Sequence, residues 1–560
     1  MRKRLLKPLV LVGVMLAALT VASMGGAGET GHQNATLVFG ASADPRILDP
    51  VLVSDGESLR PIRQMYEGLM TVVPGTARVA PQLALNYRSS RGGRTWVFNL
   101  RRGVTFHDGT QFNAQAVCYN FNRWYGFTGA FQSSAATAYW QNIFGGFKST
   151  VGKPDAPAAQ RTSLFSSCRA LSRYRVQLNL TRASASFLGA LSLPSFSFSS
   201  PTALRRWQAN SAELGAGGPV FTGSYGFAHP TGTGPFRFSS WRRGEQLTIV
   251  RYARYWGTKS HLSRIIFRAI PTNAGRLQAL QTGEVQGYDL VDPQDMPTIQ
   301  SNSRLRLLNR PQFNVAYVAI NQAKPPMNRL AVRQAIAHGL DRAAVANSSI
   351  YAGRGQVAHA FMPPSLPGYA ANVTKYPYNP TRSQQLLRSA GLTLPVKIEF
   401  WFPSGVQRPY MPDPPRIFQA FAASLERSGF DVEAKSAPWS PDYLNAAQTG
   451  NAGHLHLLGW TGDYADADNF LGEFFQSSKP QFGFNNPAIH NLLTRAEGEP
   501  NAQRRIALYQ QANRLIMNYL PGVPYAHTRP ALGFQSRVRG YIPSPVSLEP
   551  FRLVFFAGGA

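Results

Sequence analysis

The chain has 560 residues, 44% of them hydrophobic and 15% charged, with 50 glycines and 41 prolines. This length allows about three or four domains, and the composition is that of a folded, loop-rich globular protein, which excludes a disordered or repetitive chain. The formal net charge is +29. The basic residues are nevertheless scattered as single arginines or pairs after Arg2-Lys3-Arg4, without a basic helix or an aromatic-interleaved stripe, so we expect no nucleic-acid partner.

The first residues indicate export. A basic start is followed by an apolar run from Leu9 and by small residues from Ala22 to Gly28. This pattern predicts a signal peptide over residues 1–28 and an extracytoplasmic mature protein, in the periplasm or on the outer face of the membrane. The run from Leu9 to Ala27 also approaches the length of a membrane span, so an uncleaved anchor is the alternative. No cysteine lies near residue 25, which argues against a lipid-modified N-terminus.

Cys118 and Cys168 are the two cysteines of the chain. In an oxidising compartment they suggest one disulfide, which would close a loop of about 50 residues and stabilise the fold by about 4 kcal/mol on the chain-entropy model. Two buried free thiols are the alternative. Metal ligation by these cysteines is not expected, because no histidine or acidic cluster lies at ligand spacing around them.

In chain order, the first half is dominated by strand patterns. Strands are predicted within 36–50, 94–109, 173–180 and 232–257. A helix follows 94–109, because Val117, Phe121 and Trp124 fall on one helical face, whereas 126–165 is weakly patterned. The Gly-Thr-Gly-Pro turn at 232–235 is interpreted as structural, since its proline lacks the N–H that a phosphate loop would use.

The second half alternates helices and strands. Helices are predicted over 328–342, 379–392 and 501–522, and strands over 396–402 and 454–460. The second helix has clear ends, with Asn379 as N-cap, Pro380 at the first helical position and Gly391 as terminator. Strands and helices therefore mix throughout, which predicts an α/β or α+β class.

No local motif indicates catalysis. The chain lacks a Gly-x-Ser-x-Gly elbow, a His-Glu-x-x-His helix, a Walker phosphate loop and a calcium loop. We therefore expect no enzyme, no cofactor and no metal. His454 and His456 lie two apart on a predicted strand and could begin a metal site, but two polar residues on a partly wet strand is the simpler interpretation.

The stretch "WTGDYADADNF" (460–470) concentrates scarce negative charge beside aromatic rings, with carboxylates at Asp463, Asp466 and Asp468. Hard-cation ligation is one interpretation, although the spacing lacks the glycine and distal glutamate of a calcium loop. For Asp466 and Asp468 the simpler interpretation is a solvated acidic loop.

Several stretches in order resemble one family, the large extracytoplasmic solute-binding proteins of ABC importers (family 5) that carry di- and oligopeptides or nickel complexes. They are "TWVFNLRRGVTFHDGTQFNAQAVCYNFNR" (95–123), "GTGPFRF" (232–238), "RYARYW" (251–256), "LQALQTGEV" (277–285), "VRQAIAHGLDR" (332–342) and "LYQQANRLIMNYLPGVPY" (508–525). The chain departs from the family at Gln286, where an acidic residue is usual, in a longer, cysteine-bearing 126–170 segment, and in the missing lipid-attachment cysteine.

The resemblance implies an α/β, two-lobed clamshell of the periplasmic-binding-protein type with an additional domain. Lobe I would combine 36–60, 190–305 and 520–560, the additional domain II would be 61–189, and lobe III would be 306–519. The ligand would be enclosed at the hinge.

The resemblance also implies a role for the acidic stretch. In peptide-binding members the aspartate of a motif like "WTGD" pairs with the free α-amino group of the ligand, which points to Asp463. An ammonium entering a closed cleft loses hydration and needs a compensating charge. Trp460, Gly462 and Tyr464 would complete this ligand site, with the two aromatic side chains as its wall.

The expected function is capture of di- or oligopeptides and delivery to ABC permease subunits, by a protein that we expect to be monomeric. Within the same fold, nickel chelates, opines and glycosides are alternative ligands. A secreted enzyme or a signalling receptor domain would be an alternative use of the clamshell.

Overall fold

The computed structural model describes residues 35–215, 218–547 and 549–558. The predicted signal segment 1–28 lies outside the described residues. Within those three ranges, no helix is both long enough and apolar enough to cross a bilayer.

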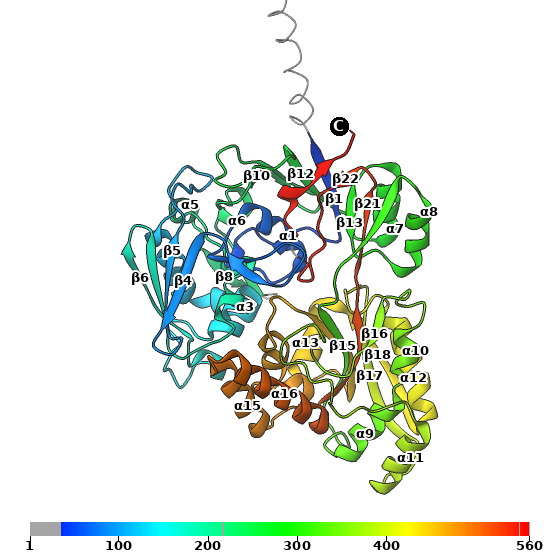
Figure 1. The fold of residues 1–560 in the computed structure, drawn as a ribbon. Coiled ribbons are helices and arrows are strands. Elements are labelled where there is room, and N and C mark those ends of the chain that lie inside the picture. The colour runs from blue at the N-terminus through cyan, green and yellow to red at the C-terminus, as the bar shows by residue number, and fades with distance from the viewer. Residues whose placement is uncertain (1–34, 216–217, 548, 559–560) are drawn as a thin grey trace, which may run out of the picture.

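A seven-stranded sheet forms the upper half of the molecule (Figure 1). In sheet order its strands are β10 (Phe236–Arg242), β11 (Gln246–Arg251), β12 (Arg264–Ala269), β1 (Thr36–Ala41), β13 (Gly287–Asp289), β21 (Ala531–Gln535) and β14 (Leu305–Asn309). β1 runs parallel to β12 and β13, and the remaining pairs are antiparallel. Phe39 packs against Phe267 and Phe551 on one face, and the other face receives helix α7 (Asn273–Thr282) through Leu280 and Tyr288. Helices α1 (Gly56–Met65) and α8 (Met296–Ser301) complete this half.

A six-stranded sheet forms the core of the lower half. In sheet order its strands are β16 (Gly355–Val357), β20 (Gly522–Thr528), β15 (Asn314–Ile320), β19 (Leu455–Thr461), β17 (Val396–Ser404) and β18 (Phe430–Pro438). Every residue of β15 is buried, as expected for a central strand covered on both faces. The helices of this half are α9 (Leu330–Gly339), α10 (Arg342–Ala346), α11 (Pro380–Ser389), α12 (Pro414–Arg427), α13 (Leu444–Thr449), α14 (Glu473–Phe475), α15 (Pro487–Gly498) and α16 (Ala502–Tyr519).

A third, four-stranded antiparallel sheet lies beside the first. Its strands, in sheet order, are β4 (Ala84–Ser90), β5 (Thr95–Leu100), β7 (Arg175–Leu180) and β6 (Phe165–Ser172). Helix α2 (Ala114–Tyr125) packs on it, and the predicted disulfide is present between Cys118 of α2 and Cys168 of β6. The weakly patterned segment also contains helix α3 (Ser134–Phe144), which the sequence pattern did not reveal.

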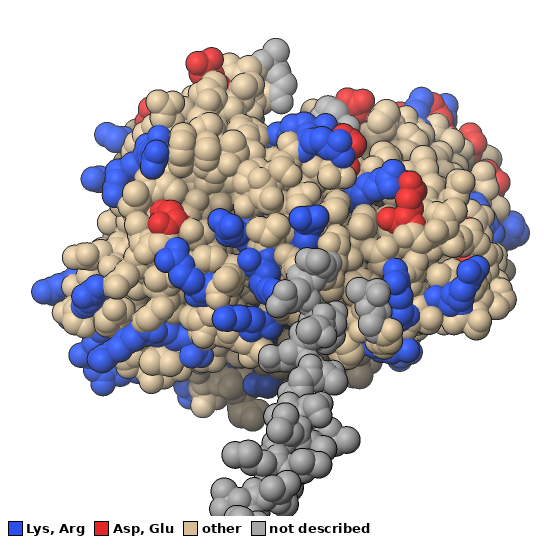
Figure 2. Space-filling model, turned by 90° about the horizontal axis from the view of Figure 1, so that it is seen from above, with Lys and Arg blue, Asp and Glu red and all other residues tan. Residues whose placement is uncertain are grey.

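The remaining elements are short. They are β2 (Met70–Val72) with β3 (Val79–Pro81), β8 (Ala212–Gly215) with β9 (Gly218–Phe221), β22 (Val538–Arg539) with β23 (Phe555–Phe556), and helices α4 (Phe187–Ala190), α5 (Pro201–Arg206) and α6 (Tyr225–Ala228). The face seen in Figure 2 carries many more basic than acidic side chains, spread over it in small groups and not gathered into one stripe.

The chain crosses between the two large sheets twice, from β14 to β15 and from β20 to β21. The crossings are bonded side by side, because Asn314 accepts from the backbone N–H of Thr528 and donates to its carbonyl oxygen. Next to them, Arg310 is fully buried and forms ion pairs with Asp289 and with Glu549, the latter at 2.8 Å. On the upper side of this junction, the paired charge network fixes the start of the first crossing against β13 and the C-terminal segment.

Most predicted elements are confirmed, and so is the α/β class with mixed sheets flanked by helices. Asn379 caps α11 by accepting from the backbone N–H of Arg382, and Gly391 beyond its end has a positive φ of 73°. The division into lobes I to III at the stated boundaries stays a prediction. The structure places β20 in the six-stranded sheet and β21 in the seven-stranded one.

Candidate ligand-binding site

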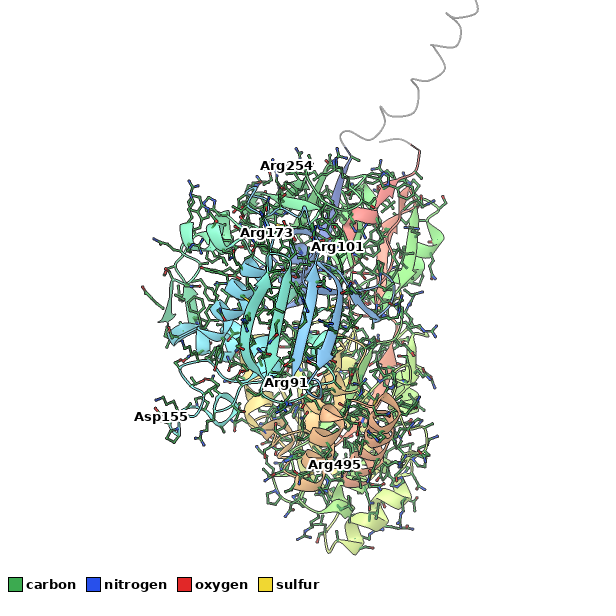
Figure 3. All side chains as sticks on the ribbon, turned by 60° about the vertical axis from the view of Figure 1, so that its left-hand side comes forward. Arg91, Arg101, Asp155, Arg173, Arg254 and Arg495 are labelled. Carbon is green, nitrogen blue, oxygen red and sulfur yellow. A yellow bond between two sulfur atoms is a disulfide. The ribbon has the colours of Figure 1, made fainter. Side chains whose placement is uncertain are left out.

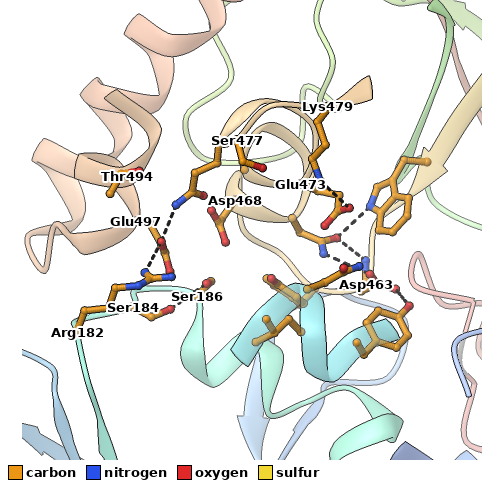
Figure 4. Close-up of a pocket in the computed structure, with 18 residues that line it drawn as sticks. Arg182, Ser184, Ser186, Asp463, Asp468, Glu473, Ser477, Lys479, Thr494 and Glu497 are labelled. Atoms are coloured by element: carbon orange, nitrogen blue, oxygen red, sulfur yellow. Dashed lines mark hydrogen bonds and ion pairs between the residues drawn. The ribbon is translucent and has the colours of Figure 1, made fainter. Parts of the chain in front are cut away.

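A cavity of about 390 Å³ lies where the third sheet and its helices meet the lower half of the molecule (Figure 4). One wall comes from α3 and from the segment that follows β7. The other comes from the end of β19, the acidic segment after it and α15. The lining residues are Tyr139, Asn142, Ile143, Arg182, Ser184, Ser186, Trp460, Asp463, Tyr464, Asp468, Asn469, Gly472, Glu473, Gln476, Ser477, Lys479, Thr494 and Glu497.

Asp463 is held in place by neutral hydrogen-bond donors. The hydroxyl of Tyr139 donates to Oδ1 at 2.8 Å, and the side-chain amide of Asn469 donates to Oδ2 at 3.2 Å. The oxygen of that same amide accepts from the backbone N–H of Asp463 at 2.7 Å, so Asn469 fixes both the backbone and the side chain.

Burial raises the pKa of Asp463 to about 6, and the two hydrogen bonds only partly offset that effect. Among the described residues, no arginine, lysine or histidine lies within ion-pair distance of this carboxylate. Asp463 is thus a partly buried carboxyl group whose side-chain hydrogen-bond donors are neutral, and the cations that line the cavity, Arg182 and Lys479, are paired with other carboxylates.

The aromatic residues around it have different roles. Trp460 lines the cavity and packs edge-on against Phe474, with ring centroids 6.1 Å apart. Tyr464 also lines it, and its ring lies so close to Gly189 of α4 that a Cβ there would come within 2.6 Å. Gly462 is not a lining residue. A Cβ atom at this position would lie 2.3 Å from the ring of Phe313. Only glycine therefore fits here without a shift of its neighbours.

The interpretation of Asp466 and Asp468 as a solvated acidic loop is wrong. The Asp466 side chain is 12% exposed and lies 3.6 Å from Arg505. Asp468 faces the cavity, with the hydroxyl of Tyr509 at 3.4 Å, and burial together with the negative charges of Glu497 and Asp466 holds its pKa well above the ordinary value.

The remaining charges of the cavity are paired. Arg182 and Glu497 lie 2.6 Å apart, and Lys479 lies 3.7 Å from Glu473. The cavity therefore contains two paired carboxylates and two, Asp463 and Asp468, for which the described residues supply no ion-pair partner.

Sequence reasoning did not find Tyr139, Arg182 or Glu497. Tyr139 lies 324 residues from Asp463 and in a segment without a clear pattern. Arg182 and Glu497 are separated by 315 residues. No local signal marks either pair, because each depends on how distant segments pack.

The two histidines do not form a pair. His456 is fully buried in the central sheet, neither ring nitrogen has a hydrogen-bond partner, and burial lowers its pKa to about 3. The interpretation of His456 as a polar residue on a wet strand is therefore wrong. His454 accepts from the backbone N–H of Glu399. Throughout the described ranges, no group of three or more histidine, cysteine, aspartate or glutamate side chains is placed to hold a metal ion.

Comparisons with known proteins agree with this architecture. The model of the family "Bacterial extracellular solute-binding proteins, family 5 Middle" matches residues 78–482. The chain is 28% identical to a dipeptide-binding protein of Escherichia coli K12, with 97% of each chain covered. It is also 28% identical to heme-binding protein A of Haemophilus influenzae, with 92% of each covered.

Among solved structures, the chain is similar to the ABC transporter-associated periplasmic binding protein DppA of Helicobacter pylori in complex with the peptide STSA. The TM-score is 0.78 at 26% identity, and 93% of this chain and 98% of that one are covered.

Proposed function

The chain belongs to family 5 of the bacterial extracellular solute-binding proteins, and we propose that its solute is a short peptide with a free α-amino group, which it delivers to an ABC permease. The observation that carries the proposal is Asp463, a partly buried carboxyl group that faces the cavity and for which the described residues supply no ion-pair partner.

The chemistry of a peptide N-terminus fits this carboxylate. An ammonium group carries three N–H donors and one positive charge, and it loses hydration on entering a closed cavity. A charge-assisted hydrogen bond to Asp463 would compensate that loss and would in turn stabilise the ionised carboxylate. Tyr139 and Asn469 keep the carboxylate oriented before the ligand arrives.

The aromatic rings and the size of the cavity suit the rest of a short peptide. Trp460 and Tyr464 offer apolar walls to the first side chain while excluding water from the ion pair. The E. coli relative is named a dipeptide-binding protein and the H. pylori structure contains the peptide STSA, which supports a short peptide as the solute.

Both walls would contact the ligand. Tyr139 and Arg182 belong to the part of the chain before the first crossing, whereas Asp463 and Glu497 follow it. A ligand bound between them favours the closed arrangement over an open one, so capture is a shift in the population of closed molecules. The permease would bind the closed conformation in preference to the open one. We further propose that the protein acts outside the cytoplasm as a monomer.

Other solutes lead to different expectations. A nickel chelate, an opine, a glycoside or a heme would use the same fold without needing an anion at Asp463. The heme-binding relative is as similar to this chain as the dipeptide-binding one, each at 28% identity, so overall similarity does not decide between them.

The test is to purify the protein without added ligand, denature it and identify the released molecules by mass spectrometry. Peptides of about two to five residues with free N-termini are the expected result. A single chelate, sugar or heme would leave the family assignment intact but overturn the peptide proposal.

A further inference from the structure

A second cavity, of about 160 Å³, is lined by the charged side chains Arg63, Arg101, Arg552 and Glu67. It lies in the upper half of the molecule, where α1, the β2–β3 hairpin and the segment near the C-terminus meet. Arg101 marks its position in Figure 3, at the upper end of the four-stranded sheet, whereas Arg91 lies at the lower end, toward the ligand cavity. The two cavities share no lining residue.

Glu67 is the acidic residue that lines this cavity. Its carboxylate oxygens have no lone pair left to accept a hydrogen bond from an arginine. Its carboxylate accepts four hydrogen bonds from neutral donors. These are Tyr255 Oη at 2.8 Å and Gln82 Nε2 at 3.3 Å on Oε1, and Thr233 Oγ1 and Trp256 Nε1, both at 2.8 Å, on Oε2. A carboxylate offers about four lone-pair sites, so all of them are occupied. Glu67 contributes negative charge to the cavity but no further hydrogen bond.

The three guanidinium groups around the cavity have few hydrogen-bond acceptors within the protein. Arg63 donates to the hydroxyl of Thr71, and Arg101 donates through Nε to the carbonyl oxygen of Gln82. Arg552 forms no side-chain hydrogen bond or ion pair with any other described residue. Each guanidinium has five N–H donors, so most of the donors around this cavity have no protein acceptor.

None of these guanidinium nitrogens is among the buried polar atoms without a partner, so the donors facing the cavity are open to solvent and to an incoming anion. Burial and the neighbouring charge of Arg552 both lower the pKa of Arg63, although the charge of Glu67 opposes them. Arg101 is held by stacking, with its guanidinium carbon 4.6 Å from the centre of the Trp256 ring. Four prolines also line the cavity and stiffen its walls, at positions 74, 81, 235 and 550. Stacking on Trp256 thus holds Arg101 and the prolines stiffen the walls, whereas no hydrogen bond or ion pair to a described residue fixes the Arg552 guanidinium.

We propose that this cavity binds a phosphate-type oxyanion through Arg63, Arg101 and Arg552. Guanidinium groups present paired N–H donors that match the spacing of phosphate oxygens, and the oxyanion would supply the acceptors that Glu67 cannot. The volume of about 160 Å³ is well above the roughly 10–15 Å³ that one water needs, so a phosphate group fits. Inorganic phosphate and the phosphate of an anionic lipid headgroup share this chemistry.

Calorimetry with inorganic phosphate tests the site on the full chain, with chloride replaced at constant ionic strength. The expected result is saturable 1:1 binding that weakens at least tenfold in Arg552→Gln. Arg101→Lys, which keeps the charge but loses the planar fork, should also weaken binding. Arg382→Gln, which removes an exposed charge from α11, is the matched control and should bind phosphate like the unaltered protein.

Vesicles distinguish the two sources of phosphate. If the lipid headgroup is the ligand, binding to phosphatidylglycerol vesicles exceeds binding to phosphatidylcholine vesicles, and the difference falls in Arg552→Gln but not in Arg382→Gln. Equal behaviour of the two variants with both probes, or no phosphate binding and no preference for anionic vesicles, would overturn the proposal.

Discussion

Two groups of buried carboxylates in this molecule behave in opposite ways. At the junction of the two large sheets, Asp289 is contacted by Arg310 and by Arg60. Burial alone would raise its pKa, but the two guanidinium groups outweigh burial and hold that pKa well below its ordinary range. In the cavity that contains Asp463, burial raises the pKa of this residue to about 6; the neutral donors Tyr139 and Asn469 offset burial only in part, and the charge of Glu473 adds to it.

The opposite pKa shifts of Asp289 and Asp463 suggest different roles for the two carboxylates, one in stability and one in ligand binding. Removing one partner of a buried ion pair is strongly destabilising, whereas a carboxyl group with a raised pKa that faces a cavity is a candidate for binding a cation, which is the role that we propose for Asp463. We therefore expect mutations at the junction to alter stability and mutations in the cavity to alter ligand binding.

The largest effect is expected at the junction. Arg310→Met leaves Asp289 and Glu549 buried and short of a partner, which should lower the free energy of unfolding by about 3–5 kcal/mol. Denaturant unfolding measures this. Arg268→Met is the control, because its ion pair with Glu284 is exposed and should contribute less than about 1 kcal/mol. Similar losses in the two variants would contradict the role of the network.

The disulfide belongs neither to the junction nor to the cavity that contains Asp463. We expect its removal to lower the stability of the fold without changing peptide affinity. Replacing Cys118 and Cys168 with alanine frees a loop whose ends are 50 residues apart, which should lower the free energy of unfolding by about 2–4 kcal/mol. Neither cysteine lines the ligand cavity, so peptide affinity measured below the unfolding transition should stay within about twofold. A tenfold loss of peptide affinity in the double-alanine variant would contradict this expectation. It would show that the disulfide is needed to keep the third sheet and its helices in position beside the cavity.

Binding should depend on pH through Asp463. A free-amine peptide binds the ionised carboxylate, so affinity should be nearly constant from pH 7 to 7.5 and fall as the pH drops below about 6, approaching tenfold per pH unit. Calorimetry between pH 5 and 7.5 measures the profile. Asp289 stays ionised over this range, so the junction should not contribute. A flat profile would show that the carboxylate is not the ligand partner.

A smaller effect is expected from Tyr139→Phe, which removes the hydroxyl donor to Asp463. Because that hydrogen bond lowers the pKa of Asp463, its loss should move the fall in affinity to higher pH and weaken binding about threefold to tenfold at pH 7. Tyr174→Phe, in the turn before β7, is the control and should leave both unchanged. An unaltered pH profile in Tyr139→Phe would contradict the assigned contact.

The comparison also shows what the sequence could and could not predict. Helix α11 and its ends follow from local chemistry at Asn379 and Gly391. The family resemblance singled out Asp463, and the structure places that residue in the lining of a cavity, while its role in ligand binding stays a prediction. Helix α3 was not predicted, although Ala136, Trp140 and Phe144 recur at helical spacing on its buried face, because the helix is short, lies in a weakly patterned segment and bends at Thr137.

Charge partners were the hardest feature to predict. Asp289 and Asp463 are both isolated acidic residues in the sequence, and only the packing of distant segments gives arginines to the first and Tyr139 to the second. For the same reason, the burial of Asp468 and His456 was not predicted.

The most direct test of the central claim is the affinity of Asp463→Asn for matched peptides, one with a free N-terminus and one N-acetylated. We expect a loss of about 10-fold to 100-fold for the free-amine peptide, since a hydrogen bond to a charged group contributes roughly 1.5–3 kcal/mol, and little change for the acetylated one. Asp431→Asn, on exposed β18, should bind both like the unaltered protein. Equal losses for the two peptides in Asp463→Asn would contradict the account, because the carboxylate would then support the fold and not the ligand.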